Sequence, residues 1–370
     1  MTDRSNLEVS VVSDRADLAG LVAQWEDLAR HALEPNPLYE HWMMLPALAA
    51  AQPAALCCVL VWNGKRLEAM FPFQRARRFK RLGLGTLTSW RHRSWMLCTP
   101  LVRTGAARGC LAALFDWLNR ENEPLAEFRY VPSDGRFYGA LADALREREG
   151  MAVATESFTR ALVRNDAAAQ TSLSGEHRRE LARKERRLRE RGQLEHVTLR
   201  DGDDAGRWID EFLELEANGW KGRQGSALAC SEENRRFAVA ALTAAAHMNR
   251  LVMHGLDFEG RPIARHCYLL GGDGAFFYRT AFDEEFAYYS PGVLAGAYGL
   301  RELQALRAVK WMDSISDPDN PVVNRLWKDR RTMQSLVVGI GAWGELWASA
   351  ILPAAALARR TGASAGAANG

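Results

Sequence analysis

Proton-transfer groups in the C-terminal half of the chain occur on or beside short apolar segments. His266 lies within the segment Ala264–Tyr268, and an imidazole changes its charge close to neutral pH. It could therefore take a proton from a substrate, although a histidine buried in the core is the structural alternative. Carboxylates that could play the same part are Asp313, Asp283 and Glu216.

Two short motifs could bind charged or apolar groups. Ser290-Pro291-Gly292 has the composition of a helix start, with serine as N-cap and proline in the first turn. Free N–H groups at such a start can bind phosphate, although many ordinary helices begin this way. In Trp220-Lys221-Gly222-Arg223, the glycine explains the end of a helix. Trp220 would line a pocket or anchor the core, and Lys221 or Arg223 could meet an anion.

A basic segment, Glu176–Arg191, precedes these motifs. It carries eight Lys or Arg and four Glu, a net charge of 8 − 4 = +4 over 16 residues. Leu181 and Leu188 share one face of the expected helix. A solvated helix with pairs such as Glu180 and Lys184 is one interpretation. The other is binding of anionic lipid headgroups or of a phosphorylated donor.

Hydrophobic periodicity predicts the elements that position these residues. In residues 1–165 it predicts a helix over 15–30 and a hairpin of Leu56–Trp62 and Arg66–Phe73 turning at Asn63-Gly64. Further helices are expected at 106–120 and Phe137–Glu149, and strands at Leu125–Val131, Met151–Phe158 and Arg160–Val163. This half is therefore predicted to be mixed α/β.

A polar linker at residues 165–175 separates it from a second α/β half, residues 166–360, and a low-complexity tail, 361–370, that we expect to be disordered. Helices are expected at Ala205–Trp220 and Glu232–Asn249, followed by strands Leu251–Phe258, Ile263–Leu270 and Ala275–Phe282. A helix over 292–308, a strand Val309–Ile315 and a helix after Pro321 complete this half.

This order of elements, with the stretch FFYRTAFDEEFAYYSPGVL (residues 276–294), resembles GNAT acyltransferases of the cellulose-biosynthesis (CelD/BcsL-type) group. That group is related to Fem-type aminoacyltransferases. Three further stretches are similar: Arg178–Arg191, Leu215–Leu228 and Trp311–Lys328. The resemblance covers residues 170–330 well and the first half in outline. It implies tandem GNAT-like halves, each with a mixed, mostly antiparallel sheet flanked by helices.

The resemblance also implies an acyl-CoA donor site. The strand ending in Thr280, Ala281 and Phe282 would diverge from Val309–Ile315 and present free backbone groups to the pantetheine chain. The helix start at Ser290, Gly292 and Val293 would bind the pyrophosphate. The usual glycine-rich loop is absent, and Ser290-Pro291-Gly292 stands in its place.

Catalysis would require a base for the attacking amine. His266 is the first candidate and Asp313, at the mouth of the diverging strands, the second. Trp220, Lys221 and Arg223 would bind the acceptor. No tyrosine follows Tyr298, so the usual acid for the thiolate is lacking, and Tyr288 or Tyr289 are weak substitutes.

The expected function is N-acylation by acyl-CoA of an amine on a lipid, such as a sphingoid base giving ceramide, or on an envelope precursor. Alternatives are aminoacyl transfer from tRNA, acetylation of a polysaccharide, and a GNAT-like binding subunit without activity. A lipid acceptor is favoured by the basic segment and by the apolar, Trp-bearing stretch Met333–Ala358, which would either pack on the core or contact a membrane.

Composition narrows the partners. The net charge of +3 does not indicate DNA, and no aromatic residues interleave the basic run to support tRNA. None of the six cysteines has zinc-ligand spacing, so no metal is expected. The N-terminus lacks an apolar signal core. We therefore expect a cytoplasmic protein, with an anionic surface of the inner membrane as a candidate partner.

Overall fold

The computed structural model describes residues 7–76, 85–165, 174–306 and 308–341, together with Gly344, Leu346 and Ser349. The chain forms two compact units that interleave along the sequence. Unit 1 comprises Met1–Tyr39, Pro53–Phe158 and Thr332–Gly370, and unit 2 comprises Glu40–Gln52 and Thr159–Arg331. Most of the expected linker and the tail 361–370 lie outside the described residues. Whether residues 1–165 and 166–360 fold as separate domains stays a prediction.

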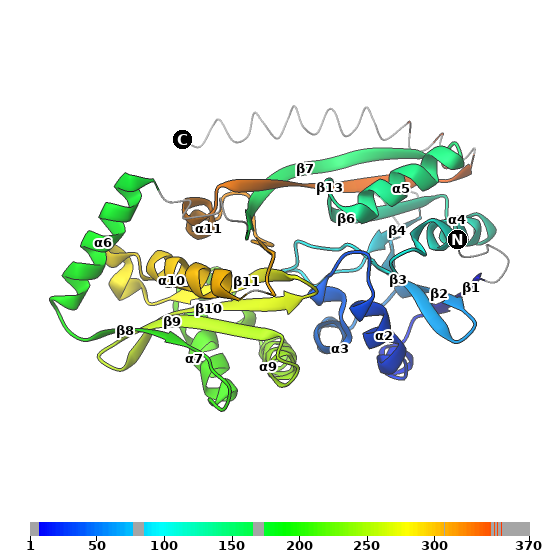
Figure 1. Ribbon diagram of the computed structural model, residues 1–370. Coiled ribbons are helices and arrows are strands. Elements are labelled where there is room, and N and C mark those ends of the chain that lie inside the picture. The colour runs from blue at the N-terminus through cyan, green and yellow to red at the C-terminus, as the bar shows by residue number, and fades with distance from the viewer. Residues whose placement is uncertain are drawn as a thin grey trace. The chain divides into compact units, whose positions relative to one another are not determined.

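In unit 1, antiparallel strands are followed by one parallel pair (Figure 1). β1 (Leu7–Val12), β2 (Leu56–Asn63), β3 (Arg66–Ala76) and β4 (Thr86–Ser89) pair in succession, all antiparallel. β4 then pairs in parallel with β6 (Leu125–Pro132), and β6 pairs antiparallel with β13 (Asp329–Gly339). The remaining elements are β5 (Leu101–Val102), α1 (Arg15–Ala19), α2 (Val22–Arg30), α4 (Ala107–Arg120) and α5 (Arg136–Glu147).

Unit 2 repeats this pattern. β8 (Leu194–Thr198), β9 (Leu251–Phe258), β10 (Arg261–Gly271) and β11 (Gly274–Phe282) pair antiparallel. β11 then pairs in parallel with β12 (Trp311–Asp313), and β12 pairs antiparallel with β7 (Met151–Arg164). The helices are α3 (His41–Ala51), α6 (Gly175–Arg189), α7 (Ala205–Asn218), α8 (Trp220–Arg223), α9 (Glu232–His247), α10 (Pro291–Ala305) and α11 (Pro321–Leu326), with the 3₁₀ segments η3 (Leu228–Cys230) and η4 (Glu284–Tyr289).

The two repeats exchange their last strands. In sequence, β7 ends the first repeat, yet its residues Leu162–Arg164 pair with β12 of the second. β13 ends the second repeat, yet Met333–Gly339 pair with β6 of the first. Each unit is therefore completed by a strand from the other repeat. The predicted class of tandem, mixed α/β halves with mostly antiparallel sheets flanked by helices is confirmed.

Glycines let α10 pack directly on the strands of unit 2. A methyl group built on Gly296 would lie 2.6 Å from Leu326 Cδ1 and 3.0 Å from His266 Cε1, and one on Gly299 would lie 2.7 Å from His254 Cδ2. Contacts this short are below van der Waals distance, so only glycine fits at both positions. The helix thereby covers both histidines.

Some elements differ from the prediction. The helix expected over 205–220 ends at Asn218, and Trp220 begins a separate short helix. The strands expected at Met151–Phe158 and Arg160–Val163 are one continuous strand. α3 was not predicted because Pro46 interrupts it and it is apolar on every side. Of the stretch Met333–Ala358, residues 333–339 belong to β13, and most of the rest lies outside the described residues. Among the described helices, none combines the length and apolar character needed to cross a bilayer.

Candidate functional site

A free strand edge lies at the centre of unit 2. β11 pairs with β12 only at Gly274, Ala275 and Phe276, whereas its other edge pairs with β10 as far as Phe282. Among the described residues no strand pairs with the outer edge of residues 277–282. The two strands thus diverge after Asp313, as the resemblance to GNAT acyltransferases implies. Unpaired backbone groups of this kind can bind an extended ligand as an added strand.

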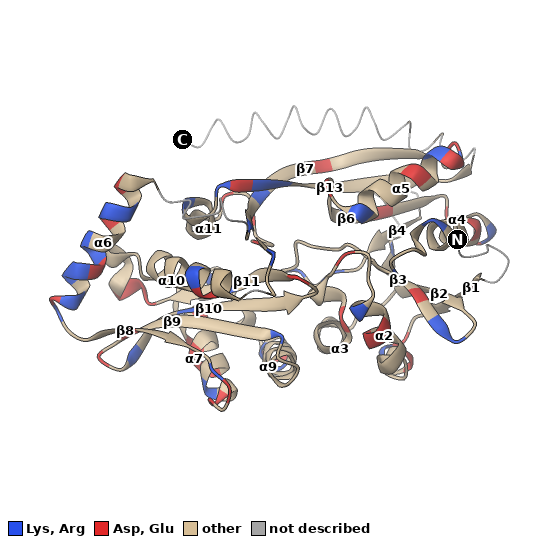
Figure 2. Ribbon diagram, in the orientation of Figure 1, with Lys and Arg blue, Asp and Glu red and all other residues tan. Residues whose placement is uncertain are grey.

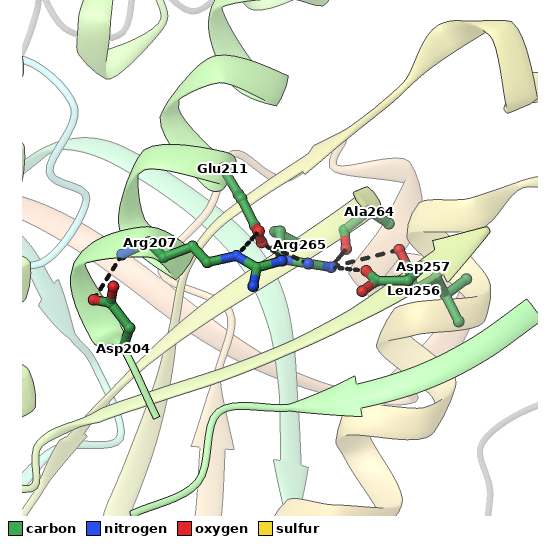
Figure 3. A network of polar contacts seen from close by, with 7 residues as sticks. All are labelled: Asp204, Arg207, Glu211, Leu256, Asp257, Ala264 and Arg265. Atoms are coloured by element: carbon green, nitrogen blue, oxygen red, sulfur yellow. Dashed lines mark hydrogen bonds and ion pairs between the residues drawn. The ribbon is translucent and has the colours of Figure 1, made fainter. Parts of the chain in front are cut away.

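A buried salt-bridge network holds α7 against the neighbouring strands (Figure 3). The Arg265 guanidinium of β10 donates to Glu211 Oε2 of α7 at 2.6 Å and to Asp257 Oδ1 of β9 at 2.6 Å. It also lies 4.4 Å from the ring centre of Trp208. Because Arg265 is 1% exposed, these partners compensate a charge that would otherwise be costly to bury. This network positions the end of α7 over β11.

Lys221 contacts the free edge directly. Its Nζ donates to the Thr280 carbonyl at 2.7 Å and to Glu216 Oε1 at 3.0 Å. Arg279 Nη1 donates to the same Glu216 oxygen at 3.1 Å, and Glu216 Oε2 accepts from Leu228 N at 2.7 Å. Three sequence candidates, Lys221, Glu216 and Thr280, are thus brought together.

Lys221 and Glu216 differ in how strongly this cluster favours their charged forms. Burial lowers the pKa of Lys221, and the Glu216 carboxylate opposes that shift only in part. Burial raises the pKa of Glu216, but the Arg279 and Lys221 cations outweigh it and hold the pKa below its usual value. Glu216 is therefore ionised near neutral pH, while Lys221 loses its proton more readily than an exposed lysine does.

Trp220 and Arg223 flank the end of β11. The indole is 45% exposed, so the reading of Trp220 as a core anchor is wrong. Its backbone N–H donates to Glu284 Oε1 at 2.6 Å, and Arg223 Nη2 lies 2.7 Å from Glu284 Oε2. Through Glu284 in η4, the short helix α8 is held beside the segment that follows β11.

The start of α10 lies eight residues after β11. Ser290 is the residue before the helix, as predicted, but it has φ of +55° and its side chain makes no capping bond. Its carbonyl accepts from Val293 N at 3.0 Å, and its Oγ accepts from Lys184 Nζ of α6 at 2.9 Å. Gly292 and Val293 are buried. No local pattern of residues indicated that Lys184 would contact this helix start.

His266 is fully buried between β10 and α10. Neither ring nitrogen has a hydrogen-bond partner among the described residues, and the Phe277 ring centre lies 5.2 Å away. Burial, and secondly the neighbouring His254, lowers the pKa of His266 to about 3. The ring is therefore neutral near pH 7 and binds a proton weakly, which favours the core-histidine alternative over a general base.

Asp313 is the centre of a buried ion-pair network. Arg160 Nε lies 2.6 Å from Oδ1 and Arg331 Nη1 lies 3.1 Å from Oδ2, while Ile315 N donates to Oδ1 at 2.9 Å. Burial raises the pKa of Asp313, but the two arginines outweigh it and hold the pKa low. With both oxygens engaged by cations, the carboxylate is poorly suited to accept a proton. The sequence could not reveal this, because Arg160 and Arg331 lie on the two exchanged strands.

The remaining candidates occupy the expected elements. Ala281 and Phe282 pair with Arg265 and Ala264 of β10, and Thr280 Oγ1 has no hydrogen-bond partner among the described residues. Tyr288 is 62% exposed and accepts from Arg187 Nη1 at 2.6 Å. In the part of the chain that the structure describes, no three His, Cys, Asp or Glu side chains are grouped to hold a metal ion.

Comparison with known proteins identifies the family of the segment that contains these residues. Residues 175–317 match the family described as acetyltransferase (GNAT) domain. This segment is a GNAT domain. It contains α6, the free edge of β11, the Lys221 cluster and the start of α10. No curated protein matches the sequence significantly.

Solved structures share the fold of the GNAT domain and of the repeat before it. FemX is 8% identical, with 90% of this chain and 97% of that chain covered and a TM-score of 0.56. The C-terminal domain of a putative lysylphosphatidylglycerol synthetase from Agrobacterium fabrum is 12% identical, with 89% and 94% covered and a TM-score of 0.55. A protein of unknown function from Bacteroides thetaiotaomicron is 13% identical, with 90% and 100% covered and a TM-score of 0.50. At these identities the similarity concerns the fold.

Proposed function

We propose that the chain transfers an acyl group from acyl-CoA to a primary amine. The observation that carries this proposal is the unpaired edge of β11 over residues 277–282, with only eight residues between the end of β11 and the start of α10. An extended pantetheine chain fits such an edge, and a pyrophosphate is stabilised by the N-terminus of a helix. Lys184, held by Ser290 Oγ, adds a positive charge beside that terminus.

Lys221 is the group that we assign to proton transfer. The amine nitrogen attacks the thioester carbonyl, a C–N bond forms, the C–S bond breaks, and the nitrogen loses a proton that is finally taken up by the CoA thiolate. Once it has released its own proton, Lys221 can accept the amine proton and pass it to the thiolate. Its lowered pKa and its contact with Thr280 O support this role. His266 is less suitable because burial lowers its pKa, and Asp313 because both of its carboxylate oxygens are paired with arginines.

The acceptor that we propose is an amine of a lipid, such as a sphingoid base, or of an envelope precursor. The exposed Trp220 beside Lys221 supports an acceptor with an apolar part, because an indole offers a large apolar surface. One structural relative is named as a lysylphosphatidylglycerol synthetase, which supports a lipid acceptor only by analogy.

Donor binding tests the proposal. Acetyl-CoA and palmitoyl-CoA would be titrated into the full chain by calorimetry, with Gly292→Glu as the test variant. A carboxylate at that position repels the pyrophosphate, so we expect at least tenfold weaker binding. Gly292→Ala is the matched control, since its methyl group would lie 3.4 Å from Phe282 Cδ1, an ordinary contact. Absence of binding by the parent chain, or equal affinities of both variants, would contradict the donor site.

Turnover tests the role of Lys221. With a bound thioester and a panel of primary amines, thiol release by Lys221→Met should fall by about 10²-fold or more, while donor affinity is retained. A Trp220→Ala variant should raise KM for amines with long alkyl chains and leave short amines unaffected. Aminoacyl-tRNA would be offered as an alternative donor, and transfer from it with no use of CoA thioesters would overturn the proposal.

A further inference from the structure

The outward face of α6 has a charge pattern that the acyl-transfer site does not use. The inner face of this helix is apolar: Leu188 is fully buried and packs with Leu256, Ile263 and Leu294, and Leu181 is partly buried against the same cluster. The apolar stripe of the helix therefore packs against the protein core. Only its charged face remains available to a partner. Figure 2 marks the Lys and Arg positions along α6 in blue.

The glutamates of this helix neutralise only some of its cations. Glu180 pairs with Lys184 at 3.0 Å, Glu185 with Arg189 at 2.8 Å, and Glu190 with Arg186 at 3.6 Å. Among the other cations, four exposed arginines spaced four residues apart form what we call the arginine row: Arg179, Arg183 and Arg187 of α6, and Arg191 two residues after its end. Within the described ranges, no carboxylate lies within ion-pair distance of a member of this row.

The spacing of the row is unfavourable for the helix by itself. Arg179, Arg183 and Arg187 are four residues apart on α6, so neighbours lie one above the other on the helix surface, and like charges at this spacing destabilise a helix. A helix that is merely solvated gains from alternating charges instead. The helical part of the row, from Arg179 to Arg187, extends over about 12 Å, given a rise of about 1.5 Å per residue. Anionic groups that lie along the row would relieve the repulsion.

The end of the row meets two tyrosines, one exposed and one partly buried. Arg187 Nη1 donates to Tyr288 Oη at 2.6 Å, and Arg191 Nη1 donates to Tyr289 Oη at 3.1 Å. The Tyr288 side chain is 62% exposed. Tyrosine is enriched at membrane–water interfaces, where its ring is apolar and its hydroxyl is hydrated. A nucleic-acid surface would instead interleave stacking rings with cations along the strand, whereas both tyrosines lie at one end of the row.

We propose that the arginine row is a docking surface for an anionic lipid membrane. The helix would lie along the membrane surface without inserting, because its apolar face is buried in the protein. Each arginine close to anionic lipid strengthens binding about fivefold, and salt weakens this attraction. The proposal concerns the location of the chain and does not depend on its donor or acceptor.

Sedimentation with vesicles tests it. The full chain would be mixed with vesicles of equal parts phosphatidylglycerol and phosphatidylcholine, and with phosphatidylcholine alone. The parent should bind the anionic vesicles only, and less at high salt. The variant with all four row arginines changed to glutamine should bind at least about 100-fold more weakly. Arg179→Gln with Arg183→Gln, which removes no hydrogen bond seen in the structure, should lose about 25-fold and serves if the quadruple variant does not fold.

The matched control changes the same net charge elsewhere on unit 2. Exposed arginines Arg200, Arg207, Arg235 and Arg236 would be replaced by glutamine, with little expected loss. An equal loss of vesicle binding in this control would show that binding depends only on net charge, and would overturn the proposal. So would failure of the parent to bind anionic vesicles. Row-dependent binding of a single-stranded RNA that is tighter than vesicle binding at the same ionic strength would also overturn it, in favour of a nucleic-acid surface.

Discussion

Replacing Asp313 by asparagine separates a structural role from a catalytic one. The substitution keeps the size of the side chain and removes its charge. Asp313 and Arg160 are both 0% exposed, and they form a two-pronged contact, Nε to Oδ1 at 2.6 Å and Nη2 to Oδ2 at 2.8 Å. Arg331 adds a third cation contact at 3.1 Å. Asp313→Asn would leave the buried Arg160 guanidinium without a counter-charge.

Asp313→Asn should lower the free energy of unfolding by a large amount. Removing one partner of a buried ion pair typically destabilises a protein by about 3–5 kcal/mol, because the remaining charge stays buried and uncompensated. This is comparable with much of the stability of an ordinary domain, about 5–15 kcal/mol. Acid should act in the same direction. Since the folded-state pKa of Asp313 is lowered, its contribution is present above the unfolded-state pKa of about 3.9 and is lost as pH falls through the folded value.

Urea unfolding followed by circular dichroism measures this cost. The control is Asp313→Leu combined with Arg160→Met, which removes both charges. Replacing a buried ion pair by apolar side chains is often nearly neutral, so the double variant should recover much of the lost stability. If Asp313→Asn unfolds at the same urea concentration as the parent and loses only turnover, the structural assignment is wrong and Asp313 is a reacting group.

Three further results are expected. Burial lowers the pKa of His266 to about 3, so as pH falls below about 6.5 the unfolded state binds a proton before the folded state does. Between about pH 7.5 and 5, the parent should therefore lose about 2 kcal/mol more stability than His266→Gln. Equal losses of stability by the two proteins in urea unfolding would contradict this. A methyl group on Gly222 would lie 1.7 Å from the Ala217 carbonyl oxygen, so Gly222→Ala should displace α8 and lower Tm, whereas Gly139→Ala in α5, with nothing within 4 Å, should raise it slightly. A fragment of residues 166–331 lacks Arg160 and the strand beside β12, so it should melt at a lower temperature than residues 151–331; equal melting would show that β7 is dispensable.

Local sequence signals predicted most elements of the fold. Asn63-Gly64 identified the β2–β3 hairpin, because Gly64 adopts a φ of +59° that other residues avoid. The three-strand meander, β9 to β11, was marked by alternating apolar residues and glycine turns. Pairings between distant segments were not accessible in this way. No local pattern specifies that Leu162 lies opposite Asp313 or that Met333 lies opposite Pro132.

The candidate site was predicted in position more accurately than in chemistry. The divergence of β11 was implied by the resemblance to GNAT acyltransferases, and the helix start at Ser290 was expected from residues close in sequence. The environments of His266 and Asp313 depend on burial and on arginines more than 15 residues away, which the residue types alone do not reveal. Lys221 or Arg223 was expected to bind a negative group of the acceptor, which stays a prediction; in the structure Lys221 pairs with Glu216 of the chain itself. The contact of Lys221 with the Thr280 carbonyl arises from tertiary packing.

The exchange of last strands has a consequence for the order in which the chain is synthesised. On the ribosome, β6 is complete at Pro132, but its partner Met333 follows 333 − 132 = 201 residues later. At about 5–20 residues per second, the outer edge of β6 stays unpaired for about 10–40 s. An open strand edge can pair with another nascent chain. Slower elongation, or a stall before β13 emerges, should therefore increase aggregation of this protein even when each finished molecule is stable.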